Sequence, residues 1–213
     1  MSSVESSRSK TRWPVSVLIR RVLWTYLLEP LVSGLPKPMS AIRILALRWM
    51  GASIGQGCLI ARGVKVLMPW NLTLEDQVVI GSGVDLYNYA PIHVGRRSVV
   101  SQGSYLCTGS HDFRVPHFPL IYSPITIGSD CWLAAGVFVC PGVSVADGVV
   151  VGARSVVTKS LVEPWTIHAG HPAVRLSARR MREDDPAASQ AAPERPDSMT
   201  SCRVPMAPGG GVR

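Results

Sequence analysis

A six-residue repeat from Ile54 to Val162 constrains the fold of this chain more than any other feature. Read in steps of six, with short shifts after some groups of three hexads, every hexad begins with Leu, Ile or Val. An amphipathic helix would repeat its apolar residues every three or four positions, and a half-buried strand every two. A period of six with recurring glycines instead predicts an all-β parallel β-helix built from hexapeptides. The leading positions are Ile54, Ile60, Val66, Leu74, Ile80, Leu86, Val94, Val100, Leu106, Ile127, Leu133, Val139, Val145, Val151 and Val157.

Three hexads form one coil of a triangular prism, so the repeat predicts about five coils stacked about 4.8 Å apart. The residues left between coils, 72–73, 92–93 and 112–126, would all fall at the same corner, where a solenoid tolerates insertions. The longest insertion contains three prolines, and a long loop inside a compact repeat is usually functional. The predicted coils are residues 54–71, 74–91, 94–111, 127–144 and 145–162.

Composition divides the rest of the chain around this repeat. The first residues are rich in Ser and Arg and the last in Ala, Pro and Gly, and such segments are expected to be disordered. The 213 residues suit one domain with short appendages. The expected organisation is 1–12 disordered, 13–50 an N-terminal helical cap, 51–178 the β-helix with its loop at 112–126, and 183–213 a disordered tail.

The helical segment allows two interpretations. In its second predicted helix, Met39 to Met50, one face follows helical spacing, and we expect the helices to cover the open edge of the first coil. The residues of that face are Ile42, Leu45, Ala46 and Trp49. The alternative is peripheral attachment to a membrane. Residues 1–50 hold eight Lys or Arg against two Asp or Glu, within a chain of net charge +8, and this excess would favour an anionic surface.

Other partners and compartments are less favoured by the composition. No basic run interleaves with aromatic residues on a recognisable module, so no nucleic-acid partner is expected. No apolar run reaches the roughly 18–20 residues of a membrane span. The five cysteines are odd in number and fit no zinc-binding spacing, which favours reduced thiols and therefore a cytoplasmic location. Within the cytoplasm, the protein could also be attached peripherally to the inner face of the membrane.

Four motifs give the chain a family resemblance. They are Leu86-Tyr87-Asn88, Leu106-Cys107-Thr108-Gly109-Ser110-His111-Asp112, Cys131-Trp132-Leu133-Ala134 and Val151-Gly152-Ala153-Arg154-Ser155-Val156. With them, roughly residues 13–178 resemble the hexapeptide-repeat acyltransferases, and most of all the O-acetyltransferases of the colanic acid biosynthesis type. The resemblance implies a left-handed β-helix, whereas parallel crossovers in general are right-handed.

The resemblance also implies an activity and a catalytic residue. It implies acetyl transfer from the co-substrate acetyl-CoA to a sugar hydroxyl, in a homotrimer with sites between neighbouring prisms and without a metal. His111 matches the general base of the family. A sugar hydroxyl attacks a thioester only if its proton is removed as the bond forms, and histidine has an unperturbed pKa that suits this task.

Further site residues come from the same resemblance, position by position. The acceptor-contacting candidates are Asn88 and Asp85. The donor-contacting candidates are Trp132 beside the pantetheine arm, Ala153, Thr158 and Lys159 along the CoA channel, and Arg175 near a phosphate.

Three other functions stay open at this point. A γ-type carbonic-anhydrase-like metalloenzyme on the same fold needs three histidines on zinc, and His117 lies six residues beyond His111 but in a Pro-rich loop. Covalent catalysis by Cys107 would use His111, four residues on, as its base. A non-catalytic scaffold that docks on membranes would need only the basic, apolar N-terminal segment.

Overall fold

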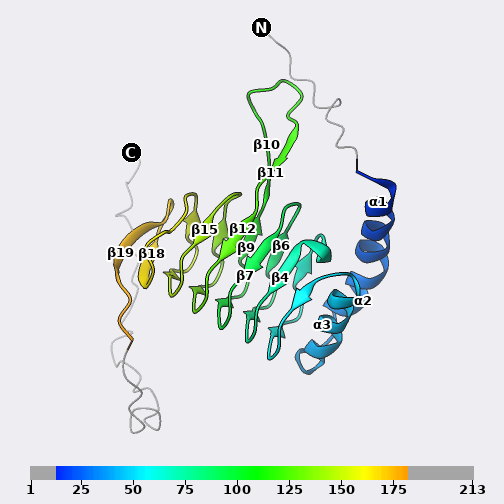
Figure 1. Ribbon diagram of the computed structural model, residues 1–213, viewed down its shortest axis with the longest axis horizontal. Helices are drawn as coiled ribbons and strands as arrows, with labels where there is room; N and C mark the ends of the chain where they lie inside the picture. Colours follow the sequence, from blue (N-terminus) through cyan, green and yellow to red (C-terminus); the bar gives the residue numbers. More distant parts are fainter. Residues whose placement is uncertain (1–12, 182–213) are drawn as a thin grey trace, which may run out of the picture. The chain divides into compact units, whose positions relative to one another are not determined.

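The computed structural model describes residues 13–181, and it folds them into a parallel β-helix with a helical segment at one end (Figure 1). The predicted disorder of residues 1–12 and 183–213 lies outside the described residues. Three parallel sheets form the three sides of the prism, and each receives one strand from each coil. Among residues 13–181, no helix is long and apolar enough to cross a bilayer.

The strands follow one another around the prism in the predicted order. The first sheet contains β1 (Ser53–Ile54), β4 (Leu72–Leu74), β7 (Ile92–Val94), β12 (Ile125–Ile127) and β15 (Ser144–Val145). The second contains β2 (Leu59–Ile60), β5 (Val79–Ile80), β8 (Val99–Val100), β13 (Trp132–Leu133), β16 (Val150–Val151), β18 (Thr166–Ala169) and β19 (Val174–Ala178). The third contains β3 (Lys65–Val66), β6 (Asp85–Tyr87), β9 (Tyr105–Cys107), β14 (Phe138–Val139) and β17 (Val156–Val157).

The register of these sheets confirms the predicted columns. In the first sheet Ile54 lies beside Leu74, Leu74 beside Val94, Val94 beside Ile127, and Ile127 beside Val145. All fifteen leading residues of the hexads point inward, and none is more than 7% exposed. At roughly 25 cal/mol per Å² of buried apolar surface, these columns are the main source of stability.

The prism continues beyond the five predicted coils. Leu161 forms a parallel bridge with Val145, and β18 adds a strand to the second sheet, where His168 lies beside Val151. The strand β19 then turns back antiparallel to β18 and ends the sheet. The C-terminal end of the β-helix is therefore closed by a partial sixth coil.

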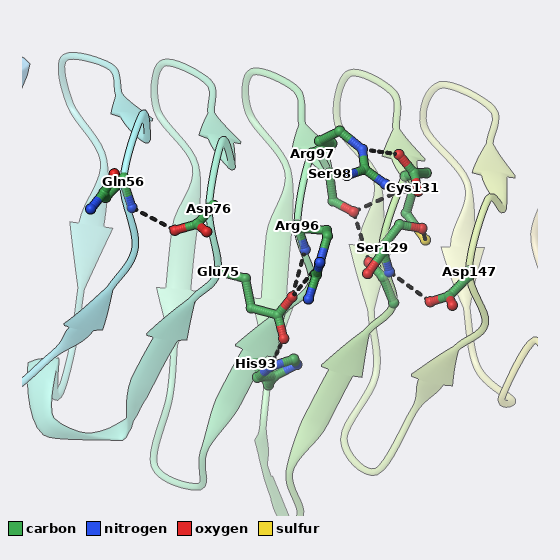
Figure 2. Close-up of polar contacts among 12 residues, drawn as sticks. Gln56, Glu75, Asp76, His93, Arg96, Arg97, Ser98, Ser129, Cys131 and Asp147 are labelled. Atoms are coloured by element: carbon green, nitrogen blue, oxygen red, sulfur yellow. Dashed lines mark hydrogen bonds and ion pairs between the residues drawn. The ribbon is translucent and has the colours of Figure 1, made fainter.

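Carboxylates at the corner between the first and second sheets bind turn amides of neighbouring coils (Figure 2). Asp76 Oδ1 accepts the N–H of Gln56, and Asp147 Oδ1 accepts the N–H of Ser129, both at 2.7 Å. Backbone donors in tight turns need such partners because they lie outside the strand ladder. Arg97 and Asp130 add an ion pair across the same corner, with two nitrogen–oxygen distances of 2.7 Å.

The helical segment covers the open edge of the first coil. Its elements are α1 (Val15–Val22), the π-helix η2 (Leu23–Leu28), α2 (Glu29–Ser33), the 3-10 turn η3 (Lys37–Met39) and α3 (Ser40–Trp49); a further 3-10 turn, η4 (Pro69–Asn71), lies in the coils. Trp24, Leu47 and Met50 are buried in the same core as the first column.

Side chains of the helices also satisfy the backbone groups of the first coil, which has no neighbour on that side. Trp24 Nε1 donates to the Val66 carbonyl at 2.6 Å, and Arg43 Nη1 to the Ile60 carbonyl at 2.8 Å. The Val66 N–H in turn donates to Glu29 Oε1 at 3.0 Å. The helices thus complete the hydrogen bonding of an edge that would otherwise be open to pairing with another chain.

Candidate active site

The catalytic candidate His111 lies on a hairpin that leaves the prism between the third and first sheets. Strand β10 (Gly109–His111) pairs antiparallel with β11 (Leu120–Tyr122), and His111 lies opposite Leu120. The hairpin projects away from the stacked coils (Figure 1). The predicted loop at residues 112–126 therefore contains a strand of its own, and all three insertions share one corner as predicted.

A backbone carbonyl orients the imidazole of His111. His111 Nδ1 lies 2.6 Å from the carbonyl oxygen of Phe118. A carbonyl can only accept a hydrogen bond, so Nδ1 carries a proton, and in the neutral imidazole Nε2 is then the nitrogen with the free lone pair. Phe118 has a φ of 45°, in the left-handed region that bulky residues rarely adopt. In its neutral form the exposed ring thus offers Nε2 as a hydrogen-bond acceptor.

Asp112, the acid next in sequence, is paired elsewhere. Its carboxylate accepts from Arg114 Nε at 2.8 Å and from Arg114 Nη2 at 2.9 Å. These hydrogen bonds to the guanidinium hold the pKa of Asp112 below its usual range. The hydrogen-bond partner of the His111 ring is therefore the Phe118 carbonyl, while Asp112 stiffens the tip of the hairpin.

Aromatic rings hold the base of this hairpin. Trp13 stacks on Tyr89 and on Tyr122, with both centroid distances at 6.1 Å. Tyr122 lies opposite Gly109 in the hairpin, and a Cβ at Gly109 would come within 3.2 Å of both the Tyr87 and the Tyr89 rings. Trp13, two residues before α1 begins, is thus in contact with the element that carries the candidate base.

The two acceptor-contacting candidates lie in different environments. Asn88 is fully buried, and its side chain both accepts from the Met68 N–H at 2.8 Å and donates to the Met68 carbonyl at 2.7 Å. Its amide therefore fastens the corner of the prism and is not free to bind an acceptor in this conformation. Asp85 lies on the outer face of the third sheet, between Lys65 and Tyr105. Burial raises the pKa of Asp85, and the nearby Lys65 ammonium opposes that shift.

An aromatic row extends along the same outer face. Tyr105 stacks on Phe138 at 5.3 Å between centroids, and Tyr87 lies 6.0 Å from Tyr105. Burial, with the Asp85 carboxylate as a further cause, raises the pKa of Tyr105 to about 12. The phenols of Tyr87 and Tyr105 stay neutral at physiological pH, so this face combines an aromatic row with the charged side chains of Asp85 and Lys65.

The donor-contacting candidates are on the surface of the later coils. Trp132 is 48% exposed on β13 and donates from Nε1 to Ser101 Oγ at 2.9 Å. Arg175 is exposed on β19 and paired with Glu163, with Nε 2.8 Å from Oε2. Ala153 is exposed at a turn of the fifth coil, and Thr158 and Lys159 are exposed at the corner from which the His111 hairpin leaves two coils earlier.

One copy of the chain does not collect all of these residues at one place. The carboxylate of Asp85 is on the third sheet, the indole of Trp132 is on the second, and His111 stands on a hairpin outside the prism. The tip of that hairpin carries Phe113, which is 80% exposed.

The structure weakens the alternative that Cys107 is a nucleophile. Its Sγ lies 3.1 Å from the Gly109 carbonyl, to which the thiol donates. Burial raises the pKa of the Cys107 thiol, whereas a reactive cysteine needs a lowered pKa. For the zinc alternative, within residues 13–181 no three His, Cys, Asp or Glu side chains are grouped so that they could hold a metal ion.

Sequence reasoning missed several residues of this region. Nothing in the spacing pointed to the Phe118 carbonyl, because a backbone oxygen has no residue signature. The hexad spacing could have identified the aromatic row, because it places Tyr87, Tyr105 and Phe138 on neighbouring strands of the third sheet. The contacts of Trp13 could not be predicted from sequence, because they depend on how the helices pack on the coils.

His168 was unassigned from sequence and proves to be a buried structural residue. It is 7% exposed and continues the inward-facing column of the second sheet beyond Val151. Its Nε2 lies 2.9 Å from Thr166 Oγ1. The Thr166 hydroxyl already donates to the Glu163 carbonyl at 2.7 Å, so His168 Nε2 is the donor to Thr166. Burial and, to a smaller extent, Arg175 lower the pKa of His168.

We expect His168 to make stability depend on pH. Because its folded-state pKa is lowered, the unfolded chain binds more protons, and stability is lost as pH falls through the unfolded pKa near 6.5. One such group contributes a slope of at most about 1.4 kcal/mol per pH unit. Denaturant unfolding at pH 5 and pH 7.5 should show a smaller pH difference in His168→Gln than in the unmodified chain. Equal pH differences in the two proteins would contradict this assignment.

Comparison with known proteins is consistent with this geometry. A family model described as bacterial transferase hexapeptide (six repeats) matches residues 124–159. The chain is 45% identical over 161 residues to the "Putative colanic acid biosynthesis acetyltransferase WcaF" of Escherichia coli (strain K12), covering 76% of this chain and 88% of that protein.

Solved structures show the same fold. A hexapeptide-repeat acetyltransferase from Vibrio cholerae, complexed with acetyl coenzyme A, superposes with a TM-score of 0.71 and 22% identity, covering 78% of this chain and 90% of that one. A maltose O-acetyltransferase from Clostridium difficile 630 gives a TM-score of 0.69 and 23% identity, covering 77% and 89%.

Proposed function

The chain belongs to the hexapeptide-repeat acetyltransferases of the left-handed β-helix fold, and on that premise we propose that it transfers an acetyl group from acetyl-CoA to a sugar hydroxyl in polysaccharide biosynthesis. The observation that supports this chemistry best is the hydrogen bond from His111 Nδ1 to the Phe118 carbonyl. It leaves Nε2 as a proton acceptor on an exposed hairpin, which is what an alcohol nucleophile requires.

The proposed step needs one proton acceptor and no covalent enzyme intermediate. His111 Nε2 takes the proton of the acceptor hydroxyl while the oxygen attacks the thioester carbonyl carbon. The tetrahedral intermediate then collapses, the carbon–sulfur bond breaks, and the CoA thiolate takes the proton from the imidazolium. The products are an acetyl ester and free CoA, and the histidine returns to its starting state.

We propose a homotrimer in which each site lies between two prisms. The support is that Trp132 lies on the second sheet, whereas His111 stands on a hairpin that leaves the prism between the third and first sheets, together with the projecting, exposed tip of that hairpin. In this arrangement the hairpin of one copy meets the donor-contacting residues of its neighbour. The same proposal places the enzyme in the cytoplasm, with residues 13–50 in peripheral contact with the inner face of the membrane.

The direct test is an acceptor screen with acetyl-CoA in which free CoA is measured. We expect CoA release that depends on a sugar or glycan acceptor and produces an acetyl ester. Release that is absent with every acceptor, combined with acceleration of CO₂ hydration and about one zinc per chain, would favour the carbonic-anhydrase-like alternative instead.

Trp132→Ala should raise the KM for acetyl-CoA by roughly tenfold and lower kcat much less. The half-exposed indole offers a large flat surface for the pantetheine arm, and loss of such a contact costs about 1–2 kcal/mol, which corresponds to this factor. Steady-state kinetics with acetyl-CoA varied at saturating acceptor measure the effect. Ser101→Ala is the matched control because it removes only the hydrogen bond to the indole. An unchanged KM in Trp132→Ala would remove this residue from the donor site.

A further inference from the structure

The first helices carry their apolar side chains on the outside of the molecule. Leu18, Ile19, Val22, Leu23, Tyr26 and Leu27 of α1 and η2 line one shallow apolar hollow, which we call the α1–η2 face. In this group Ile19 is 64% exposed and Tyr26 is 79% exposed. Scattered exposed apolar residues are ordinary, but a contiguous set of this kind marks a surface that contacts something.

The charged residues of α1 point in the opposite direction, toward the β-helix. Arg20 Nη2 donates to the Met50 carbonyl at 2.8 Å, and its guanidinium lies 4.4 Å from the Trp70 ring centroid. The Arg21 guanidinium lies 5.7 Å from the Tyr89 ring centroid. A helix on a water-exposed surface usually places its apolar stripe inward and its charges outward. Here the cations contact the protein and the apolar stripe is left for another partner.

We propose that the α1–η2 face docks on an anionic lipid surface. Of the eight Lys or Arg in residues 1–50, Arg20, Arg43 and Arg48 donate to backbone carbonyls of the protein, whereas Arg8, Lys10 and Arg12 lie shortly before α1 in the sequence. Acidic headgroups attract such a segment by about 1 kcal/mol for each basic residue near the surface. The exposed Tyr26 suits the boundary between headgroups and acyl chains. A second copy of the chain fits less well, because it would bring two basic segments together.

The docking surface is connected to the proposed catalytic hairpin. Trp13, two residues before α1, stacks on Tyr89 of the prism and on Tyr122 of the hairpin that carries His111. Binding of α1 to lipid would therefore hold this hairpin close to the surface. This consequence for acetyl transfer rests on the proposed reaction, whereas lipid docking specifies the proposed membrane contact of residues 13–50 and is tested without that reaction.

Vesicle co-sedimentation of the full chain tests the proposal. The probes are phosphatidylcholine vesicles with and without phosphatidylglycerol. The unmodified chain should bind the anionic vesicles at least about tenfold more tightly than the neutral ones, and added salt should weaken the binding. The variant Val22→Glu with Leu27→Glu should lose at least about tenfold in affinity for anionic vesicles, because it places carboxylates in the apolar face.

Val162→Glu is the matched control, since Val162 is 80% exposed on the last coil. It should bind vesicles as the unmodified chain does, and circular dichroism should show all three proteins folded. Equal binding by the double variant, or none by the unmodified chain, would overturn the proposal. So would an oligomer that dissociates only in the double variant, because a second copy would then cover the face. Loss of CoA release with vesicle binding intact would count against the proposed function alone.

Discussion

Replacing His111 with alanine should lower kcat by roughly 10²–10⁴-fold and leave the affinity for acetyl-CoA nearly unchanged. The expected loss is large because the acceptor hydroxyl then has no positioned base as it attacks the thioester. The affinity should persist because the donor-contacting candidates, such as Trp132 and Lys159, lie on the prism and not on the hairpin. Rates of CoA release and calorimetric binding of CoA measure the two effects separately.

His111→Gln is the informative control for that variant. Its side-chain amide can donate to the Phe118 carbonyl, so the hairpin should keep its conformation, but a glutamine cannot accept the proton. We expect it to be as inactive as His111→Ala with the same thermal stability as the unmodified chain. Near-normal turnover in either variant would show that another group is the base.

The fold could be predicted because a solenoid is periodic along one dimension. Each aliphatic residue that begins a hexad contacts the equivalent residues of the coils before and after it, so spacing in the sequence gives the register directly. The columns through Ile54, Ile60 and Val66 confirm this, since every predicted member is buried. The insertions could be placed as well, because they leave the columns intact only if they share a corner.

The orientation of α3 could not be predicted from the same kind of pattern. Ile42, Leu45 and Trp49 are spaced like the inner face of a helix, yet Leu45 is 68% and Trp49 70% exposed, while Arg43 is 2% exposed. The reason is that this helix covers a strand edge as well as a core. Arg43 donates to the Ile60 and Pro36 carbonyls at 2.8 and 3.1 Å and also to Leu35. A guanidinium has enough donors for several such carbonyls, which an apolar side chain lacks.

Only those residues of the candidate site that belong to a recognisable sequence motif could be predicted. The motif around His111 identifies the histidine, and the position of the insertion places it at the corner. The carbonyl that accepts a hydrogen bond from His111 Nδ1 belongs to Phe118, seven residues further along the chain, where the backbone has a positive φ. Asn88 shows that a motif can also mislead about a residue's role. Its motif is recognisable, but its side-chain amide is hydrogen-bonded to the Met68 backbone inside the prism.

Ile80→Ala should lower the free energy of unfolding by about 2–5 kcal/mol. Ile80 is fully buried in the second coil, in register with Ile60 on one side and Val100 on the other. Truncation removes three side-chain carbons from the buried core and leaves a cavity. The neighbouring strands are hydrogen-bonded on both sides and cannot move in to fill it. Denaturant unfolding measured at one fixed protein concentration checks the value, because an oligomer adds its association energy to that of the fold.

Val162→Ala provides the reference for this measurement. Val162 is 80% exposed, so its truncation should change the free energy of unfolding by no more than about 0.5 kcal/mol. In a solenoid each coil contacts only its neighbours, so the loss at Ile80 should appear as weakened hydrogen-exchange protection in the first three coils before the last ones. A loss below about 1 kcal/mol for Ile80→Ala, or uniform loss of protection along the prism, would show that the columns do not carry the stability assigned to them.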